Sequence, residues 1–376
     1  MAGPTTRARA SWVADRVTAL PELWALVALH LGLIGAWRLM LVCKAARVGA
    51  KDFLKTLPGL FVCGGDIFLG GKAVEQVWRL DLATLRWQVM PALAEVRSDH
   101  ACCAVRNGLV VIGGCASEGG VMVTVEMLAE GGGVFTGQPP LTCDGIAGAV
   151  AIVTDESDSA AGQVHLLGGY GADDESVSTV YLVDLATGVC TPQPNLLHER
   201  CQFAAARLPD GRIVCAGGRI EDVTWGLDFT DTTLSSVEVC EPPASGAVDA
   251  AWTWREFPAM SVARAGCRGC VLSDGRFVVL GGEDAGNATL SSCEALVVGH
   301  DEHWEALPSM QVARSHFACA AVAECIVVAG GVGCSPNGRA PLGSTEVFDG
   351  VLGRWLRLPC DLPYSGGLCY MGSALL

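Results

Sequence analysis

Basic side chains are scarce in this chain of 376 residues. Only 25 Lys and Arg stand against 40 Asp and Glu, which leaves a formal net charge of -15. Nucleic-acid-binding surfaces need clustered positive charge, so this deficit excludes general nucleic-acid binding. Charged residues of both signs make up only 17% of the chain and apolar residues 51%. The chain can therefore bury a large core beneath an acidic surface, which favours solubility and basic partners.

Recognisable catalytic motifs are absent as well. The sequence contains no phosphate-binding loop, no dinucleotide-binding glycine pattern and no Ser-His-Asp neighbourhood. Its seven His and four Tyr are scattered, without the spacing of a metal-ligand set. We expect a protein that is not an enzyme and that needs no metal or cofactor.

No cleavable secretory signal is evident, and this bears on the 18 cysteines. Most of them lie in apolar or small-residue runs, as Cys102, Cys103 and Cys215 do, where a free thiol behaves as a small hydrophobic group. The one Cys-x-x-Cys pair, Cys267 and Cys270, has no second pair at zinc-site spacing. The pattern predicts reduced core thiols in a cytoplasmic or nuclear protein, not a disulfide framework.

Glycine, by contrast, is abundant and periodic. A Gly-Gly pair ends a short apolar run six times, with the second glycine at positions 65, 114, 169, 218, 282 and 331. Steps of roughly 50 residues are typical of a repeat architecture. Each run is rich in β-forming residues, and glycine permits a sharp, closely packed exit from the strand.

The rest of the unit repeats with these glycines. A Pro-x-(Leu/Met)-x-x-x-Arg stretch precedes most copies, as in PALAEVR at 91–97 and PSMQVAR at 308–314, and a small-residue strand follows it. After most Gly-Gly pairs come a polar loop, a strand with an Asp turn, and a strand that opens with Trp. This unit resembles the kelch repeat, in which each copy forms one four-stranded blade. The resemblance covers residues 57–376 and implies an all-β, six-bladed kelch β-propeller.

The two ends of this region predict how the ring closes. The first Gly-Gly pair has no Arg-containing strand before it, whereas extra sequence follows the last Trp strand at Trp355. We expect residues 367–374 to supply the missing first strand, because the ring then has no open edge. Alignment of Cys360 with Met310 places Tyr364 at the position of Arg314.

A helical module precedes the repeats. Leu23, Val27 and Leu31 recur at helical spacing, and Pro21 with Glu22 suits a first helical turn. The glycines near residues 32–35 would separate two helices. We expect a flexible polar segment at 1–17, a short α-helical segment at 18–56 and the propeller at 57–376.

The opening Leu-Pro-Glu-Leu and the later Leu-Val-Cys-Lys of this module resemble an F-box, and an F-box directly before kelch repeats is a known pairing. The resemblance implies binding to the Skp-type adaptor and cullin of a ubiquitin ligase. The residues expected to contact the adaptor are Leu20, Pro21, Leu23, Val27, Leu31, Trp37, Leu41, Val42 and Cys43.

Two other interpretations of the same segment stay open. Residues 23–42 approach the length of a membrane span, although two glycines and the Leu-Pro-Glu opening interrupt the run. The segment could also be a plain helix packed on the propeller. We expect the F-box-like role and no membrane contact.

The two resemblances together imply a substrate-recognition receptor of an SCF-type cullin-RING ubiquitin ligase, with an unidentified protein client. Candidate client contacts lie beside the repeated Arg, at the rim of the propeller: Arg97, Asp99, Arg200, Gln202, Arg264, Arg314, His316 and Tyr364. Guanidinium groups there would suit acidic or phosphorylated segments. In kelch blades the same Arg can instead tie neighbouring blades together or hold the loop.

Two rival functions remain. One is a kelch scaffold unconnected to ubiquitin. The other is a metal-dependent kelch enzyme, since some plant kelch proteins hold iron through Glu-x-x-x-Asp-x-x-x-His. The nearest stretch here runs from Glu95 through Asp99 to Cys103, with Cys in place of His.

Overall fold

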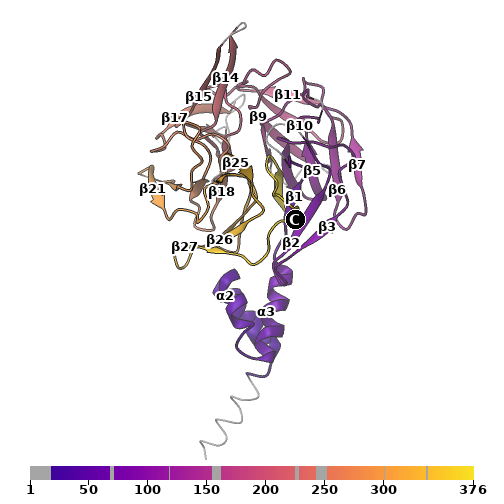
Figure 1. Cartoon of the computed structure of the whole chain (residues 1–376), viewed down its shortest axis with the longest axis vertical. Coiled ribbons are helices and arrows are strands. Elements are labelled where there is room, and N and C mark those ends of the chain that lie inside the picture. The colour runs from indigo at the N-terminus through magenta and orange to yellow at the C-terminus, as the bar shows by residue number, and fades with distance from the viewer. Residues whose placement is uncertain are drawn as a thin grey trace, which may run out of the picture.

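The computed structural model describes residues 18–67, 72–117, 119–154, 162–224, 228–242, 252–299, 301–335 and 338–376. The N-terminal segment at 1–17, expected to be flexible, lies outside the described residues. Six four-stranded antiparallel sheets form a propeller, as the sequence predicts (Figure 1). Two helices and two small hairpins complete the described elements.

The blades have the following strands, from the innermost to the outermost. Blade 1 contains β28 (Gly372–Leu375), β1 (Leu60–Cys63), β2 (Val77–Asp81) and β3 (Arg86–Met90). Blade 2 contains β4 (Ala101–Val105), β5 (Gly108–Ile112), β6 (Val125–Ala129) and β7 (Phe135–Gln138). Blade 3 contains β8 (Val150–Val153), β9 (Gln163–Leu167), β10 (Val180–Asp184) and β11 (Cys190–Gln193).

The second half of the ring repeats this order. Blade 4 contains β12 (Ala204–Arg207), β13 (Ile213–Ala216), β16 (Val237–Glu241) and β17 (Thr253–Phe257). Blade 5 contains β18 (Arg268–Val271), β19 (Phe277–Leu280), β20 (Cys293–Val297) and β21 (His303–Leu307). Blade 6 contains β22 (Ala318–Val322), β23 (Cys325–Ala329), β26 (Thr345–Asp349) and β27 (Arg354–Arg357).

Each Gly-Gly pair ends the second strand of a blade. In blade 1, Gly64 and Gly65 have φ of 53° and 105°, in the region that favours glycine. A Cβ on Gly65 would lie 2.5 Å from the carbonyl oxygen of Cys369, so a side chain there would collide with backbone. The same pair of positive φ angles recurs in every blade. The six-fold glycine pattern therefore reflects close packing between the ends of neighbouring strands.

The C-terminal strand closes the ring. β28 pairs with β1, placing Gly372 opposite Cys63 and Leu375 opposite Leu60. This confirms that the C-terminus supplies the missing strand of the first blade. The innermost strands then contact one another around the whole ring, and β28 lies between β22 and β4.

One detail of the predicted register is wrong. The amide of Gly331 donates to the carbonyl of Leu368, just as the amide of Gly282 donates to that of Arg314. Leu368, not Tyr364, therefore occupies the position of Arg314. Tyr364 packs instead with its ring edge against Trp78, at a centroid distance of 5.8 Å. Extra residues in the last connecting segment cause the slip.

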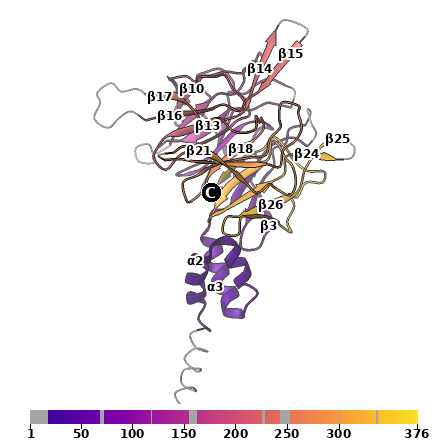
Figure 2. The same cartoon turned by 90° about the vertical axis from the view of Figure 1, so that its left-hand side faces the viewer.

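Two hairpins extend from the face that carries the Gly-Gly pairs. β14 (Arg219–Thr224) pairs with β15 (Asp228–Thr233) after the second strand of blade 4. β24 (Val332–Ser335) pairs with β25 (Gly338–Pro341) at the equivalent position of blade 6. Figures 1 and 2 show β14 and β15 at the opposite end of the molecule from the helices.

The helical segment consists of α2 (Pro21–Leu39) and α3 (Lys44–Thr56). Gly32 has φ 67° and ψ -168°, which interrupts α2 as the glycines near 32–35 predict. α3 crosses α2 so closely that a Cβ on Gly49 would lie 2.1 Å from the carbonyl oxygen of Pro21. The segment is therefore a compact helical unit rather than one long rod.

This unit rests on blades 1 and 6. Trp37 donates its indole N–H to the carbonyl of Leu82 at 2.7 Å, and Arg38 lies 3.8 Å from Asp349. Leu33 and Leu54 belong to the same buried cluster as strand residues of both blades. The contacted turns follow β2, β22 and β26, at the strand ends opposite the Gly-Gly pairs, and Figures 1 and 2 show the helices projecting from the edge of the ring.

Candidate functional site

The four repeated arginines are completely buried. Arg97, Arg200, Arg264 and Arg314 each have 0% exposure. Each donates to a carboxylate on the third strand of its own blade: Glu126, Glu238, Glu294 and Glu346, at 2.6, 2.5, 2.6 and 2.6 Å. Each also donates to the carbonyl of the first glycine in the Gly-Gly pair, as Arg314 does to Gly330 at 2.7 Å.

The partner glutamates extend this bond network to the connecting loop. Glu346 accepts the backbone amides of Gln311 and Val312 at 2.7 and 3.1 Å. The carbonyl of Arg314 itself accepts the amide of Gly282 in the preceding blade. Each arginine therefore joins one loop, its own blade and the neighbouring blade.

This arrangement corrects the expectation that Arg97, Arg200, Arg264 and Arg314 contact a client at the rim. Their charge is neutralised inside the blades and no guanidinium reaches solvent. The contacts match the alternative, in which the arginine ties blades and holds a loop. Tyr364 is also displaced from the rim, into the packing around Trp78.

The residues two positions after each of the four arginines, and after Ile146 and Leu368 at the same repeat position, meet at the axis of the propeller. Their amides and carbonyls form a closed ring of hydrogen bonds, each amide donating to the carbonyl of the preceding blade at 2.8–3.0 Å. The six members are Asp99, Gly148, Gln202, Gly266, His316 and Tyr370. Asp99, Gln202 and His316 are thus brought together, but at the axis and not at the rim where the sequence places them, and Tyr370 takes the place expected near Tyr364.

All six members of this axial ring adopt the left-handed conformation. Gly148 and Gly266 do so without steric cost, but Asp99, Gln202, His316 and Tyr370 have φ of 52°, 54°, 51° and 55°. Positive φ is uncommon for residues other than glycine and costs of order 1 kcal/mol or more each. Four side chains are therefore retained at positions where glycine would be the easier choice.

An open cavity of about 340 Å³ lies at the mouth of the axis, beside blades 1 to 3. Its polar lining comes from Asp66, Asp99, Tyr170, Gln202 and Tyr370. The hydroxyl of Tyr170 donates to Asp99 Oδ2 at 3.1 Å, and Gln202 Nε2 donates to the same oxygen at 3.3 Å. We call this set of five residues the acidic mouth.

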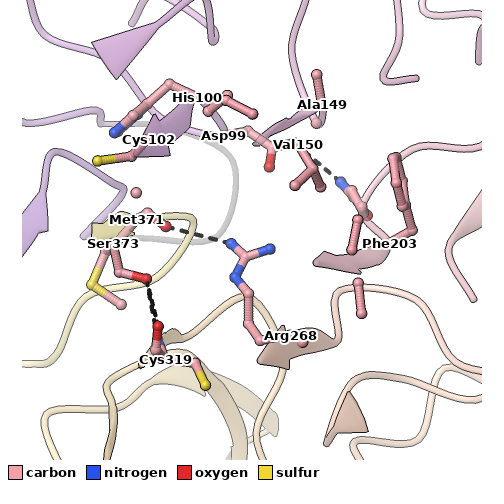
Figure 3. A pocket seen from close by; sticks show the side chains of 18 residues that line it. Asp99, His100, Cys102, Ala149, Val150, Phe203, Arg268, Cys319, Met371 and Ser373 are labelled. Carbon is pink, nitrogen blue, oxygen red and sulfur yellow. Dashed lines mark hydrogen bonds between the residues drawn. The ribbon is translucent and has the colours of Figure 1, made fainter. Parts of the chain in front are cut away.

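A second cavity of about 170 Å³ continues along the axis between the innermost strands (Figure 3). Arg268 points its guanidinium into this space, where Nε donates to the carbonyl of Phe317 at 2.9 Å and Nη2 donates to that of Met371 at 3.4 Å. Asp99 lines both cavities. The axis therefore carries carboxylates at its mouth and one guanidinium deeper inside.

Charge is distributed unevenly around the mouth. On the side of blades 4 to 6, buried Glu283 accepts a hydrogen bond from Ser315 at 2.5 Å and another from Arg339. It also lies 3.5 Å from Arg219. Burial, together with the nearby Arg268, lowers the pKa of His316 well below its ordinary value. This side is neutralised by its own ion pairs.

The acids of the mouth lie on the other side. Burial raises the pKa of Asp66 to about 6, where a hydrogen bond from Ser98 opposes the rise and the Asp99 carboxylate adds to it. Burial also raises the pKa of Asp99, although Arg268 counteracts it. No cation of the described residues forms an ion pair with either carboxylate.

The helical segment carries a second candidate surface. The side chains of Leu41 and Val42 are 83% and 62% exposed, between α2 and α3. Leu20, Leu23, Val27 and Leu31 are also exposed, and Cys43 with them. Leu26 and Leu29, which sequence reasoning did not single out, are exposed as well, and Leu26 lines one hollow with Leu23, Val27 and Leu31. We call this set of nine residues the helical apolar surface.

Two of the expected adaptor contacts are less accessible. Trp37 faces the propeller, where it is half-buried and bonded to Leu82, so it does not belong to the helical apolar surface. Pro21 is half-buried beside Gly49. The remaining expected residues are all exposed.

α2 is long and apolar enough to cross a membrane, by length and composition. No cluster of three or more His, Cys, Asp or Glu side chains within the described residues could hold a metal. The stretch from Glu95 to Cys103, which resembles an iron-binding motif, is dispersed in the structure. Cys103 is buried on β4, Asp99 lies on the axial ring, and Glu95 pairs with Arg97 at 3.4 Å.

Comparisons with known proteins show the fold alone. No family model matches the chain, and no curated protein matches it in sequence. Among 311 similar solved chains is the structure of YjhT, with a TM-score of 0.61 and 14% identity. The similarity covers 80% of this chain and 98% of that one. The chain is thus a six-bladed β-propeller, a fold that suits a protein-interaction module.

Proposed function

We propose that this protein is a substrate receptor of a cullin-RING ubiquitin ligase. The helical apolar surface binds a Skp-type adaptor, and the propeller captures a client protein in the cytoplasm or nucleus. The protein itself is not catalytic in this proposal. It delivers the client to the transferase.

The observation that carries the proposal is the exposure of the helical apolar surface. α2 is apolar around most of its circumference, yet only part of it packs on α3 and the propeller. An exposed apolar patch of this kind usually marks an interaction site, because leaving it in water is unfavourable. Most of the residues in which the segment resembles an F-box lie on this patch.

A protein partner accounts for this surface better than a membrane. The first helical stretch of α2 covers residues 21–31, or about 16 Å at the ordinary helical rise, against about 30 Å of hydrocarbon. Its break at Gly32 would leave unpaired backbone groups in lipid. α3 also packs along α2 and carries Lys44, Lys51 and Lys55.

The position of the helices suits a receptor. They contact turns at the strand ends opposite the axial ring and project from the edge of the propeller, at the other end of the molecule from β14 and β15 (Figures 1 and 2). An adaptor bound to the helices would therefore leave the acidic mouth open for a client.

The proposal is tested by capture of a purified Skp-type adaptor on the full chain. Wild type is expected to bind, and Leu41→Asp and Val42→Asp should each weaken binding by on the order of tenfold or more, because a charge is forced into an apolar contact. Val89→Asp is the matched control, since Val89 is 80% exposed on β3 of blade 1.

Failure of folded wild type to bind would contradict the proposal and favour a scaffold unconnected to ubiquitin. Equal binding by Leu41→Asp, Val42→Asp and Val89→Asp would also contradict it, because the adaptor would then contact some other surface. Circular dichroism of each variant establishes that a loss of binding is not a loss of fold.

A further inference from the structure

We infer that the acidic mouth receives a cationic side chain, arginine or lysine, of the client protein. This inference deepens the proposed client-capture role and rests on it. It concerns Asp66 and Asp99 in particular, with Gln202, Tyr170 and Tyr370 around them.

The first observation is a pair of buried carboxylates that form no ion pair within the described residues, although Arg268 and Arg219 act on the charge of Asp99 from a distance. Asp66 and Asp99 are 9% and 8% exposed, and both line the cavity. The nearest described arginines are engaged elsewhere, since Arg219 and Arg339 pair with Glu283 and Arg268 bonds to two carbonyls. A buried carboxylate is costly unless it is paired, so this arrangement is completed by an external cation.

The second observation is a set of free hydrogen-bond acceptors. Both hydrogen bonds to Asp99 fall on Oδ2, and Oδ1 accepts none from the described residues. Gln202 Oε1 is enclosed and has no partner in the described part of the chain. Acceptors of this kind suit a donor-rich group, and a guanidinium presents five N–H donors while an ammonium presents three.

The tyrosines suit the same ligand. The rings of Tyr170 and Tyr370 line the cavity, and Tyr370 is held in place by stacking on His316 at a centroid distance of 4.0 Å. An aromatic face attracts a cation that lies over it. The mouth thus combines carboxylates with aromatic rings, whereas an acidic client segment would meet repulsion from Asp66 and Asp99.

The surrounding charges allow this assignment. Arg268 lies deeper along the axis and interacts with Asp99, which favours its charged form. Glu221, Asp174 and Asp231 carry further negative charge, although Glu221 and Asp231 lie 3.9 and 3.4 Å from Arg219. Burial raises the pKa of Glu221 to about 7, where Arg219 opposes the rise and the neighbouring carboxylates add to it. The cations around Glu283 are neutralised locally. The mouth therefore keeps an excess of acid.

The test starts with a random-sequence peptide library selected on the full chain. Arginine or lysine is expected in every strongly bound peptide, and its replacement by uncharged citrulline or norleucine should weaken binding at least about tenfold. Asp66→Asn and Asp99→Asn should each remove that preference. Glu130→Gln, an exposed acid in the turn after β6, is the matched control and should bind as wild type does.

Three results would overturn the inference: peptides selected without a basic residue, unchanged affinity after replacement by citrulline or norleucine, or no peptide bound by the folded chain. The adaptor experiment is independent of all three, because it tests the helical apolar surface and not the acidic mouth. Adaptor binding without a preference for cationic peptides would overturn this inference alone. A preference for cationic peptides without adaptor binding would support the cation site and overturn the ligase role.

Discussion

At the residue scale, buried charged side chains fall into two groups in this protein. Arginines two positions before the axial ring are buried with a dedicated glutamate and hold the blades together. Asp66 and Asp99 are nearly as buried but have no such partner. Burial alone therefore does not distinguish a charged group that holds the fold together from one that can bind a ligand. The presence or absence of an ion-pair partner does.

Removal of a buried arginine should be costly. Arg314→Leu would leave Glu346 buried and unpaired, so we expect a loss of about 3–5 kcal/mol in the free energy of unfolding. Arg357→Leu, on the outer strand of the same blade, removes an exposed pair with Asp361 and should cost about 1 kcal/mol or less. Denaturant titration of both variants makes the comparison. Equal losses would show that Arg314 is no structural tie.

Replacement of Asp66 should stabilise the protein in a pH-dependent way. Its pKa is about 6 in the folded state and 3.8 ordinarily, so the folded protein binds a proton more tightly and ionisation above pH 6 costs stability. Asp66→Asn avoids that cost. Its melting temperature should exceed that of wild type above pH 6, and the difference should vanish as pH falls to 3.8. A variant less stable than wild type above pH 6 would show that the carboxylate is structural.

The sequence could predict only part of the residue-scale picture. The repeated arginine is visible, but its glutamate follows 29 to 38 residues later across loops of different length. The mouth joins two repeat positions from separate blades: Asp66 and Tyr170 directly follow Gly-Gly pairs, and Tyr370 occupies the axial position of Asp99. The repeat could have located these positions, but neither the burial of the arginines nor the meeting of these side chains is encoded in local spacing.

At the scale of elements, prediction was more successful, for a physical reason. A blade needs a Gly-Gly exit because backbone of the next blade lies within 3 Å of where a Cβ would be, as at Gly64 and Gly281. That constraint recurs six times and so leaves a period in the sequence. The last segment, which carries Tyr364, has no such constraint, and there the predicted register failed.

The closing strand is the element on which the ring depends. Removal of residues 365–376 takes away β28, which pairs with β1 and lies between β22 and β4. We expect the truncated chain to lose the cooperative thermal transition of the whole propeller, measured by circular dichroism. A synthetic peptide of residues 365–376 should restore it in part. An unchanged transition after truncation would contradict closure by β28.

At the scale of the whole molecule, two surfaces lie apart. The helical unit projects from the edge of the ring at blades 1 and 6 (Figures 1 and 2), whereas the acidic mouth opens at the axis, on the face that carries the hairpins. Their separation allows two partners to bind at once, which is what a receptor between an adaptor and a client requires. A scaffold would need the same separation, so the identity of the helix-bound partner decides between the two.

Amide hydrogen exchange of the full chain, with and without a purified Skp-type adaptor, tests whether the adaptor binds the helical apolar surface. We predict slower exchange on adaptor binding in residues 20–31 and 41–43, with exchange in the propeller strands unchanged. The helical unit is small and its apolar side chains are exposed. Slower exchange of its amides would therefore report that the adaptor has buried that surface. No protection in the helices, or protection confined to the propeller, would contradict the account.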